Sequence, residues 1–229
     1  SFYEHIDELR WRIIKSLIVV IIASSIAYFL KAQIFEILIR PLNQSLVFLS
    51  PAEAFLTFFK LSIFSGLIIA FPYMLYHAWA FIIDVFEEKK KKGILGYMIA
   101  SIILFYSAIV FCYYIILPIT LKFFSNFGNE FLLPSISFQN YFSFVIYLLL
   151  AFGLVFQFPI ILLGLINLGI LSIDSLKKQR RYIIVIVFVL AAILTPTPDG
   201  FTQIALALPV MLLFEITLLV ARLINRKTY

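Results

Sequence analysis

Hydrophobic positions in this chain gather into six long runs that polar or turn-rich segments separate. The runs cover approximately residues 13–30, 61–83, 94–121, 141–166, 182–195 and 204–221. A helix needs about 20 apolar residues to cross a hydrocarbon layer of about 30 Å. The first four runs reach or approach this length. The pattern therefore predicts an all-α membrane protein with six transmembrane helices in one polytopic domain, residues 1–229.

The last two runs are short. Residues 182–195 give about 14 positions, which corresponds to roughly 21 Å of helix. The turn Pro196-Thr197-Pro198-Asp199-Gly200 follows and cannot continue a helix. We therefore expect short fifth and sixth helices, joined by a tight hairpin, with either local thinning of the bilayer or shielding by the other helices.

Composition supports a membrane protein and excludes several other classes. Hydrophobic residues make up 63% of the chain and charged residues 13%, whereas soluble domains are about 45–50% apolar and about 25% charged. A single cysteine and two histidines exclude a disulfide framework and give no zinc constellation. The sequence contains no nucleotide-binding glycine loop and no GxSxG motif. Nucleotide-driven and nucleophile-elbow chemistry therefore lack a basis in the sequence, and no cofactor is expected.

The basic residues indicate which side of the membrane each loop faces. Most of the 18 lysines and arginines lie in the amino-terminal segment, the second loop, the fourth loop and the tail: Arg10, Arg12, Lys15, Lys89–Lys92, Lys177, Lys178, Arg180, Arg181, Arg222, Arg226 and Lys227. The other side carries only Lys31, Arg40, Lys60 and Lys122. By the positive-inside rule, both termini are predicted to be cytoplasmic. Residues 1–12 are too polar and acidic for a signal peptide and are expected to form a short cytosolic helix that leads into the first span.

The two long loops, 31–60 and 122–140, then face the extracytoplasmic side. Both contain several phenylalanines and are expected to form short helices that cap that face.

Polar residues inside the apolar runs are functional candidates, because an ionisable group at bilayer depth is costly. Glu215 lies within the sixth run, and Gln157 lies within the fourth, two residues before a helix-kinking Pro159. Asp199 and Gln203 belong to the hairpin between the last two helices. These polar groups could hold helices of the same chain together, or they could bind a partner helix. A third reading is a small-solute or ion carrier with a Glu215/Gln157 relay, although the internal repeats usual in carriers are not evident.

Weaker signals come from a histidine and from small residues. His77 is expected to be a satisfied interfacial histidine beside Trp79. The spacings Ala23/Ala27 and Ser62/Gly66 are typical of close helix packing.

Acidic residues occur at cytoplasmic positions where basic residues are usual. Glu4, Asp7 and Glu8 precede the first span, and Asp84, Glu87 and Glu88 precede the lysines of the second loop. Carboxylates recognise arginine strongly when the contact is bidentate, so a basic ligand could bind here. Intramolecular pairing with Arg10, Arg12 or the lysines is the alternative.

Taken in order, several short motifs resemble the TatC family, the core membrane subunits of the twin-arginine protein translocase. They are His5-Ile-Asp-Glu-Leu-Arg10, Ser50-Pro-Ala-Glu53, Phe71-Pro-Tyr73, Trp79-Ala-Phe81, Leu104-Phe-Tyr106, Ala151 to Pro159, Leu194 to Asp199, Gln203 and Leu213-Phe-Glu215. The resemblance covers essentially the whole chain and implies a concave bundle of six helices.

The resemblance also implies roles for single residues. The glutamate of the first motif, Glu8, would contact the paired arginines of a signal peptide, with Arg10 in the same motif. The family's second contact glutamate falls on Lys90 here, so Glu87 or Glu88 would substitute from one helical turn back. A frequent fourth-helix glutamate is replaced by Gln157. Asp199, Gln203 and Glu215 match the region where a partner helix docks.

The implied function is to receive twin-arginine signal peptides of folded cargo and to recruit single-span TatA/TatB-type partners. Transport would be driven by the proton-motive force, with no catalytic centre. The implied state is a homo- or hetero-oligomer. The expected location is a bacterial inner membrane or, for an organellar protein, a thylakoid membrane.

Overall fold

The computed structural model describes residues 2–42, 45–47, 49–84, 94–126, 136–167, 169–194 and 199–226. The fold is helical apart from one pair of two-residue strands. It divides into two compact units, an amino-terminal unit (Ser1–Ile102 with Glu130–Ile146) and a carboxy-terminal unit (Ile103–Asn129 with Tyr147–Tyr229). The expectations of one polytopic domain and of a concave bundle stay predictions.

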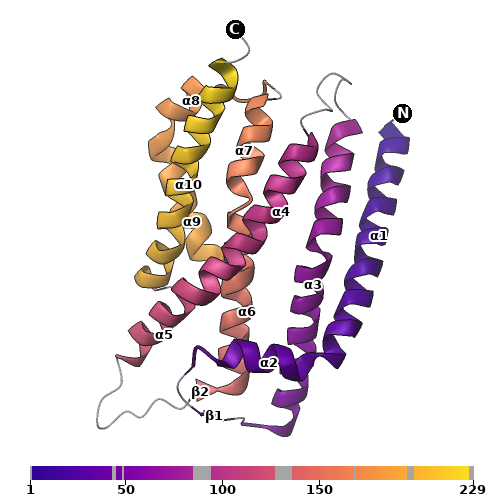
Figure 1. The fold of residues 1–229 in the computed structure, drawn as a ribbon, viewed down its shortest axis with the longest axis vertical. Helices are drawn as coiled ribbons and strands as arrows, with labels where there is room; N and C mark the ends of the chain where they lie inside the picture. Colours follow the sequence, from indigo (N-terminus) through magenta and orange to yellow (C-terminus); the bar gives the residue numbers. More distant parts are fainter. Residues whose placement is uncertain are drawn as a thin grey trace. The chain divides into compact units, whose positions relative to one another are not determined.

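The amino-terminal unit is built around two long antiparallel helices, α1 (Phe2–Phe29) and α3 (Pro51–Asp84), which lie side by side in Figure 1. The short helix α2 (Lys31–Ile39) connects them, as expected for a helix in the first long loop. α1 continues without a break from the amino-terminal polar segment into the apolar run. The first part of α4 (Ile94–Phe111) joins the unit through Trp79, whose ring stacks on Tyr97 with centroids 5.8 Å apart.

Small residues allow α1 and α3 to approach closely. A Cβ atom added to Gly66 would lie 2.1 Å from the Ser24 hydroxyl oxygen and 2.6 Å from the Ser24 Cα. Ala23, Ala27 and Ser62 are all buried. The prediction of small-residue packing is thus confirmed, and Gly66 is the position where the two backbones meet.

A buried carboxylate organises the other end of this unit. Glu53, in the first turn of α3, accepts hydrogen bonds from the Leu49 amide (2.6 Å), the Ser137 hydroxyl (2.6 Å) and the Gln139 amide (2.8 Å). Its residue surface is 5% exposed. Beside it, β1 (Leu46–Val47) pairs in parallel with β2 (Ile136–Ser137). Glu53 therefore joins the start of α3 to the segment that leads into α6 (Phe138–Val155). No strands were expected from the sequence.

The carboxy-terminal unit contains the remaining helices. The second part of α4 continues through a π-helical segment, Cys112–Ile116, into α5 (Leu117–Ser125). The second part of α6 is followed by α7 (Phe158–Asn167), α8 (Ile173–Lys178), α9 (Arg180–Leu194) and α10 (Gly200–Arg226). The break between α6 and α7 at Phe156 and Gln157 confirms the kink expected from Pro159.

Five helices within the described residues are long and apolar enough to cross a membrane: Ile6–Phe29, Pro51–Phe81, Leu95–Ser125, Phe138–Ile166 and Gly200–Leu223. α9 has 15 residues and reaches about 22 Å, so the expected short fifth helix is confirmed. The count of six spans and the cytoplasmic location of both termini stay predictions.

The expectation of a short sixth helix was wrong. α10 has 27 residues, because it begins at Gly200 and ends at Arg226, beyond both ends of its apolar run. Asp199 caps its first turn by accepting bonds from the Thr202 amide and hydroxyl, each 2.7 Å long. A cap of this kind starts a helix before its apolar residues begin.

Gly66→Ala is expected to destabilise the protein by about 1–3 kcal/mol, because the added methyl group has no space between the two backbones. Thermal unfolding in detergent measures this effect. Gly96→Ala is the matched control, since a Cβ there meets no atom within 4 Å. Equal melting temperatures for the Gly66→Ala variant and the unsubstituted protein would contradict the packing described here.

Glu53→Gln is expected to lower the melting temperature by several degrees, because the amide NH₂ cannot accept the hydrogen bonds that a carboxylate oxygen accepts. Glu36→Gln makes the same chemical change at an exposed position of α2 and should have little effect. If the two variants melt alike, Glu53 does not hold these segments together.

Candidate functional site

The acidic residue singled out in the first motif, Glu8, lies on α1 and pairs with an arginine of the same helix. The Arg12 Nε donates to Glu8 Oε1 over 2.9 Å, and a second Arg12 nitrogen contacts the same oxygen. The two side chains are 35% and 19% exposed, respectively. Glutamate and arginine at i and i+4 lie on one face of a helix, which explains the contact. Of the two readings left open by the sequence, the structure contains the intramolecular pair.

The other residues predicted to bind the peptide do not belong to the Glu8–Arg12 ion pair. Arg10 is exposed on α1, and a spacing of two residues puts it on a different side of the helix from Glu8. Asp7 is exposed beside it. Glu87 and Glu88 lie outside the described residues, as does Lys90.

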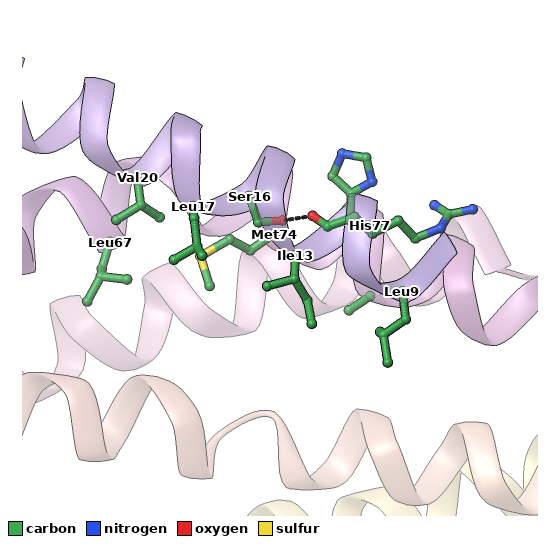
Figure 2. Close-up of a pocket in the computed structure, with 10 residues that line it drawn as sticks. Leu9, Ile13, Ser16, Leu17, Val20, Leu67, Met74 and His77 are labelled. Atoms are coloured by element: carbon green, nitrogen blue, oxygen red, sulfur yellow. Dashed lines mark hydrogen bonds between the residues drawn. The ribbon is translucent and has the colours of Figure 1, made fainter. Parts of the chain in front are cut away.

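A groove runs between α1 and α3 next to this ion pair (Figure 2). Its volume is about 300 Å³, and its lining is almost entirely apolar: Leu9, Arg12, Ile13, Ser16, Leu17, Val20, Leu67, Met74, His77 and Ala78. His77 and Leu9 lie at one end of the groove, and Val20 and Leu67 lie at the other. The groove thus has one end with polar groups and one without.

His77 differs from the satisfied histidine expected from the sequence. Its ring contacts Tyr73 and Tyr76 edge-on, with centroids 4.5 and 5.3 Å apart. Both ring nitrogens are buried and have no hydrogen-bond partner among the described residues. The nearby Ser16 hydroxyl donates to the Arg12 carbonyl of its own helix instead. The groove therefore holds a buried imidazole with unused hydrogen-bonding capacity.

The polar residues predicted to bind a partner helix take part in contacts within the carboxy-terminal unit. Gln157, 8% exposed, lies at the break between α6 and α7, and its amide nitrogen is 3.4 Å from the Gly153 carbonyl oxygen. The Gln203 amide donates to the Phe188 carbonyl of α9 over 2.8 Å. Asp199 caps α10, as described above. Of these contacts, the Gln203–Phe188 bond joins two helices, as in the reading in which polar groups hold one chain together. The contacts of Gln157 and Asp199 are local.

Glu215 is not an isolated carboxylate in the bilayer. It accepts a hydrogen bond of 2.8 Å from Arg180, and the two side chains are about half exposed, 50% and 46%. Arg180 is the first residue of α9, where the helix dipole disfavours a positive charge. The carboxylate of Glu215 offsets this effect. Glu215 therefore lies level with the beginning of α9.

Sequence reasoning missed the groove and the role of Arg180, which it took only as a sign of topology. The separation of 35 positions between Arg180 and Glu215 leaves no local signal for their contact. For the cap at Asp199 a signal did exist, because an aspartate that follows a proline turn is a common helix start. Within the described ranges, no three His, Cys, Asp or Glu side chains cluster as metal ligands would.

Comparison with known proteins finds relatives whose names all refer to TatC. The family model described as Sec-independent protein translocase protein (TatC) matches residues 4–209. The TatC protein of Aquifex aeolicus is 39% identical over 231 residues, which cover 98% of this chain and 95% of the relative. The TatC protein of Carboxydothermus hydrogenoformans is 37% identical over 232 residues, covering 100% and 96%. A protein of Gracilaria tenuistipitata var. liui called uncharacterized tatC-like protein ycf43 is 34% identical, covering 99% and 95%.

A solved structure is similar in fold as well as in sequence. The crystal structure of the twin arginine translocase receptor TatC in DDM superimposes with a TM-score of 0.85 at 38% identity. The match covers 95% of this chain and 99% of that chain.

The Arg180–Glu215 pair is expected to contribute only about 0.2–1 kcal/mol, because both groups are half exposed. A double-mutant cycle on unfolding stability with Arg180→Gln and Glu215→Gln measures the coupling directly. The exposed pair Asp174–Lys177 of α8, at 3.1 Å, serves as a control cycle. A coupling of several kcal/mol would mean that the pair is desolvated, contrary to its exposure.

Proposed function

Because the chain belongs to the TatC family of Sec-independent protein translocase proteins, we propose that it binds twin-arginine signal peptides through the segment around Glu8. The chain is a multi-pass membrane component of this translocase. The finer roles of its residues follow from their chemistry. A signal peptide with two adjacent arginines needs carboxylates at the cytoplasmic surface. Glu8 and Asp7 supply two at the end of α1 that the positive-inside rule predicts to be cytoplasmic.

The single observation that carries the proposal is the Glu8–Arg12 contact. Glu8 already holds a guanidinium group in hydrogen-bonding geometry, so Arg12 occupies the position that a ligand arginine would take. Ion pairs at i and i+4 of a helix are worth only about 0.3–0.5 kcal/mol, and this pair is partly buried, with Glu8 35% and Arg12 19% exposed. An incoming arginine pair can therefore replace Arg12 at low cost, and the intramolecular pair does not block binding.

Arg10 and one of two glutamates are the other peptide contacts that we propose. Arg10, exposed on α1, would donate to backbone carbonyls of the bound peptide. Glu87 or Glu88 would supply the second carboxylate, in place of the family glutamate where Lys90 stands. Glu8 and either of these glutamates would each take one arginine.

The α9–α10 pair is our proposed docking surface for single-span partners of the TatA/TatB type. α10 exposes an apolar stripe with helical spacing, Ile204, Leu208, Leu212, Ile216, Leu219 and Leu223. The exposed Arg180–Glu215 pair lies beside this stripe and offers a polar contact. Gln203 joins α10 to α9, Asp199 caps α10, and Gln157 lies at the break between α6 and α7. In this proposal these residues affect partner binding indirectly, by stabilising the helices that form the docking surface.

Within this function, cargo is folded protein, transport is driven by the proton-motive force, and the chain works in an oligomer without catalysing a reaction. The carrier alternative is not supported, because a proton relay needs a carboxyl group that can exchange protons along a pathway, whereas Glu215 is paired with Arg180. Bacterial relatives favour the inner membrane, and the Gracilaria relative leaves a plastid membrane open.

Glu8→Lys is expected to abolish crosslinking between the full-length protein in membranes and a twin-arginine precursor peptide, since the carboxylate is replaced by a like charge. Arg12→Gln removes the internal competitor and should raise peptide affinity by about twofold. A peptide with both arginines replaced by glutamine measures background.

The matched control is the charge swap Glu8→Arg with Arg12→Glu, which keeps an ion pair on the same face but moves the carboxylate by one turn. It should fold normally and bind weakly. Crosslinking that is unchanged in Glu8→Lys would remove Glu8 from the receptor site.

A further inference from the structure

One end of the carboxy-terminal unit carries an excess of positive charge. At this end α8 and the beginning of α9 lie against α10 (Figure 1). The chain brings six lysines and arginines here but only two carboxylates, a net charge of +4. The cations are Lys177, Lys178, Arg180, Arg181, Arg222 and Arg226, and the carboxylates are Asp174 and Glu215.

Both carboxylates of this region are already paired. Asp174 accepts a hydrogen bond from Lys177 over 3.1 Å, and Glu215 accepts one from Arg180 over 2.8 Å. Three further cations are exposed, and none of them pairs with a carboxylate of the described residues: Lys178, Arg181 and Arg222. These three residues are called the basic patch below. Their charge is not compensated within the described part of the unit.

Helix geometry gathers the basic patch around the beginning of α9. Lys178 is the last residue of α8, and Arg181 is the second residue of α9. Arg222 follows Glu215 on α10 by seven residues, a spacing that returns to the same face of a helix. Because Glu215 is bonded to Arg180, Arg222 lies two turns, roughly 10 Å, beyond the level of that pair. The patch therefore occupies one end of the unit.

The neighbours of the patch place it at the level of lipid headgroups. Val185 follows Arg181 by one helical turn, Leu219 precedes Arg222 by one turn, and both apolar side chains are exposed. Leu219 belongs to a helix that is long and apolar enough to cross a membrane. Tyr182 is also exposed, and the Arg181 guanidinium lies 4.9 Å from the centre of its ring. Exposed tyrosines of membrane proteins prefer the headgroup level.

We propose that the basic patch binds the headgroup of an anionic phospholipid. A phosphate accepts hydrogen bonds from guanidinium and ammonium groups. Arg181 donates one bond to the Tyr182 hydroxyl, which leaves other N–H groups of the guanidinium for a phosphate. A zwitterionic headgroup offers the same phosphate but adds a positive group of its own, so an uncompensated positive patch attracts it less. A soluble acidic peptide would meet the cations but not the exposed apolar side chains one turn deeper.

The amino-terminal end of α1 provides an internal comparison. Its three basic residues are matched in number by three carboxylates: Arg10, Arg12 and Lys15 against Glu4, Asp7 and Glu8. The positive-inside rule predicts that this end faces the same side of the membrane as the basic patch. We expect no preference for anionic lipid there, because the charges balance. Trp11, which is exposed, can report on the lipids at this end.

Quenching of tryptophan fluorescence by brominated lipids measures the preference at each place. The chain has two tryptophans, so Trp79→Phe leaves Trp11 as the reporter at α1. Tyr182→Trp, combined with Trp79→Phe and Trp11→Phe, reports at the patch. Each full-length variant is reconstituted into vesicles of phosphatidylglycerol and phosphatidylcholine, with one or the other lipid brominated. We expect about a fivefold preference for phosphatidylglycerol at position 182, as for one cation near a membrane surface, and none at Trp11.

Charge removal and salt assign the preference to the basic patch. Changing all three patch residues to glutamine should abolish the preference at position 182. One molar salt should do the same, because the screening length falls to about 3 Å. A matched control removes the same charge from the amino-terminal unit and should leave the preference unchanged: Lys31→Gln, Arg40→Gln and Lys60→Gln together.

Equal quenching by the two lipids at position 182 would overturn the proposal. A preference that persists in the patch variant, or that is equally strong at Trp11, would also overturn it. If thermal unfolding shows that the tryptophan variants do not fold, native mass spectrometry of the patch variant and its matched control compares the retained phosphatidylglycerol, which should fall only in the patch variant. These experiments contain no signal peptide and no single-span partner, so their failure leaves the proposed function standing.

Discussion

The close approach of α1 and α3 at Gly66 is the constraint on which the rest of the amino-terminal unit depends. Only 11% of the apolar stretch of α1 is buried, so this helix is held mainly by one neighbour. Where the backbones meet at Ser24, no side chain separates them. The groove begins beside that point, with Val20 and Leu67 at one end, and extends to Leu9 and His77 at the other. The same contact thus holds together the two helices that line the groove.

Burial distinguishes the roles of three carboxylates that look alike in the sequence. Glu53 is almost completely covered and accepts three hydrogen bonds from separate segments, which suits a structural role. Glu215 is half exposed and compensates an arginine at a helix start. Glu8 is 35% exposed and pairs along its own helix, so its partner can be exchanged. Of the three, Glu8 is the one suited to a ligand that comes and goes.

Local patterns predicted much of this fold. Apolar runs located the long helices, Pro159 located the break after α6, and the short run predicted a short α9. The length of α10 was wrong because capping at Asp199 starts the helix before its apolar run, and because the helix continues past that run to Arg226. Contacts across the chain left no local signal: Arg180 meets Glu215, Ser137 meets Glu53, and the groove is lined by residues of both α1 and α3. The Glu8–Arg12 pair was one of two readings, since spacing alone cannot tell an internal partner from a ligand.

The most direct measurement uses solid-state NMR on the full-length protein in lipid bilayers. The side-chain carboxyl of Glu8 is labelled with ¹³C, and the two arginines of a bound signal peptide are labelled with ¹⁵N. If a peptide arginine replaces Arg12 at the Glu8 carboxylate, its guanidinium lies within about 4 Å. We then expect strong dipolar dephasing of the Glu8 signal. If the labelled peptide binds and the Glu8 carboxyl shows no dephasing, Glu8 is not its receptor contact.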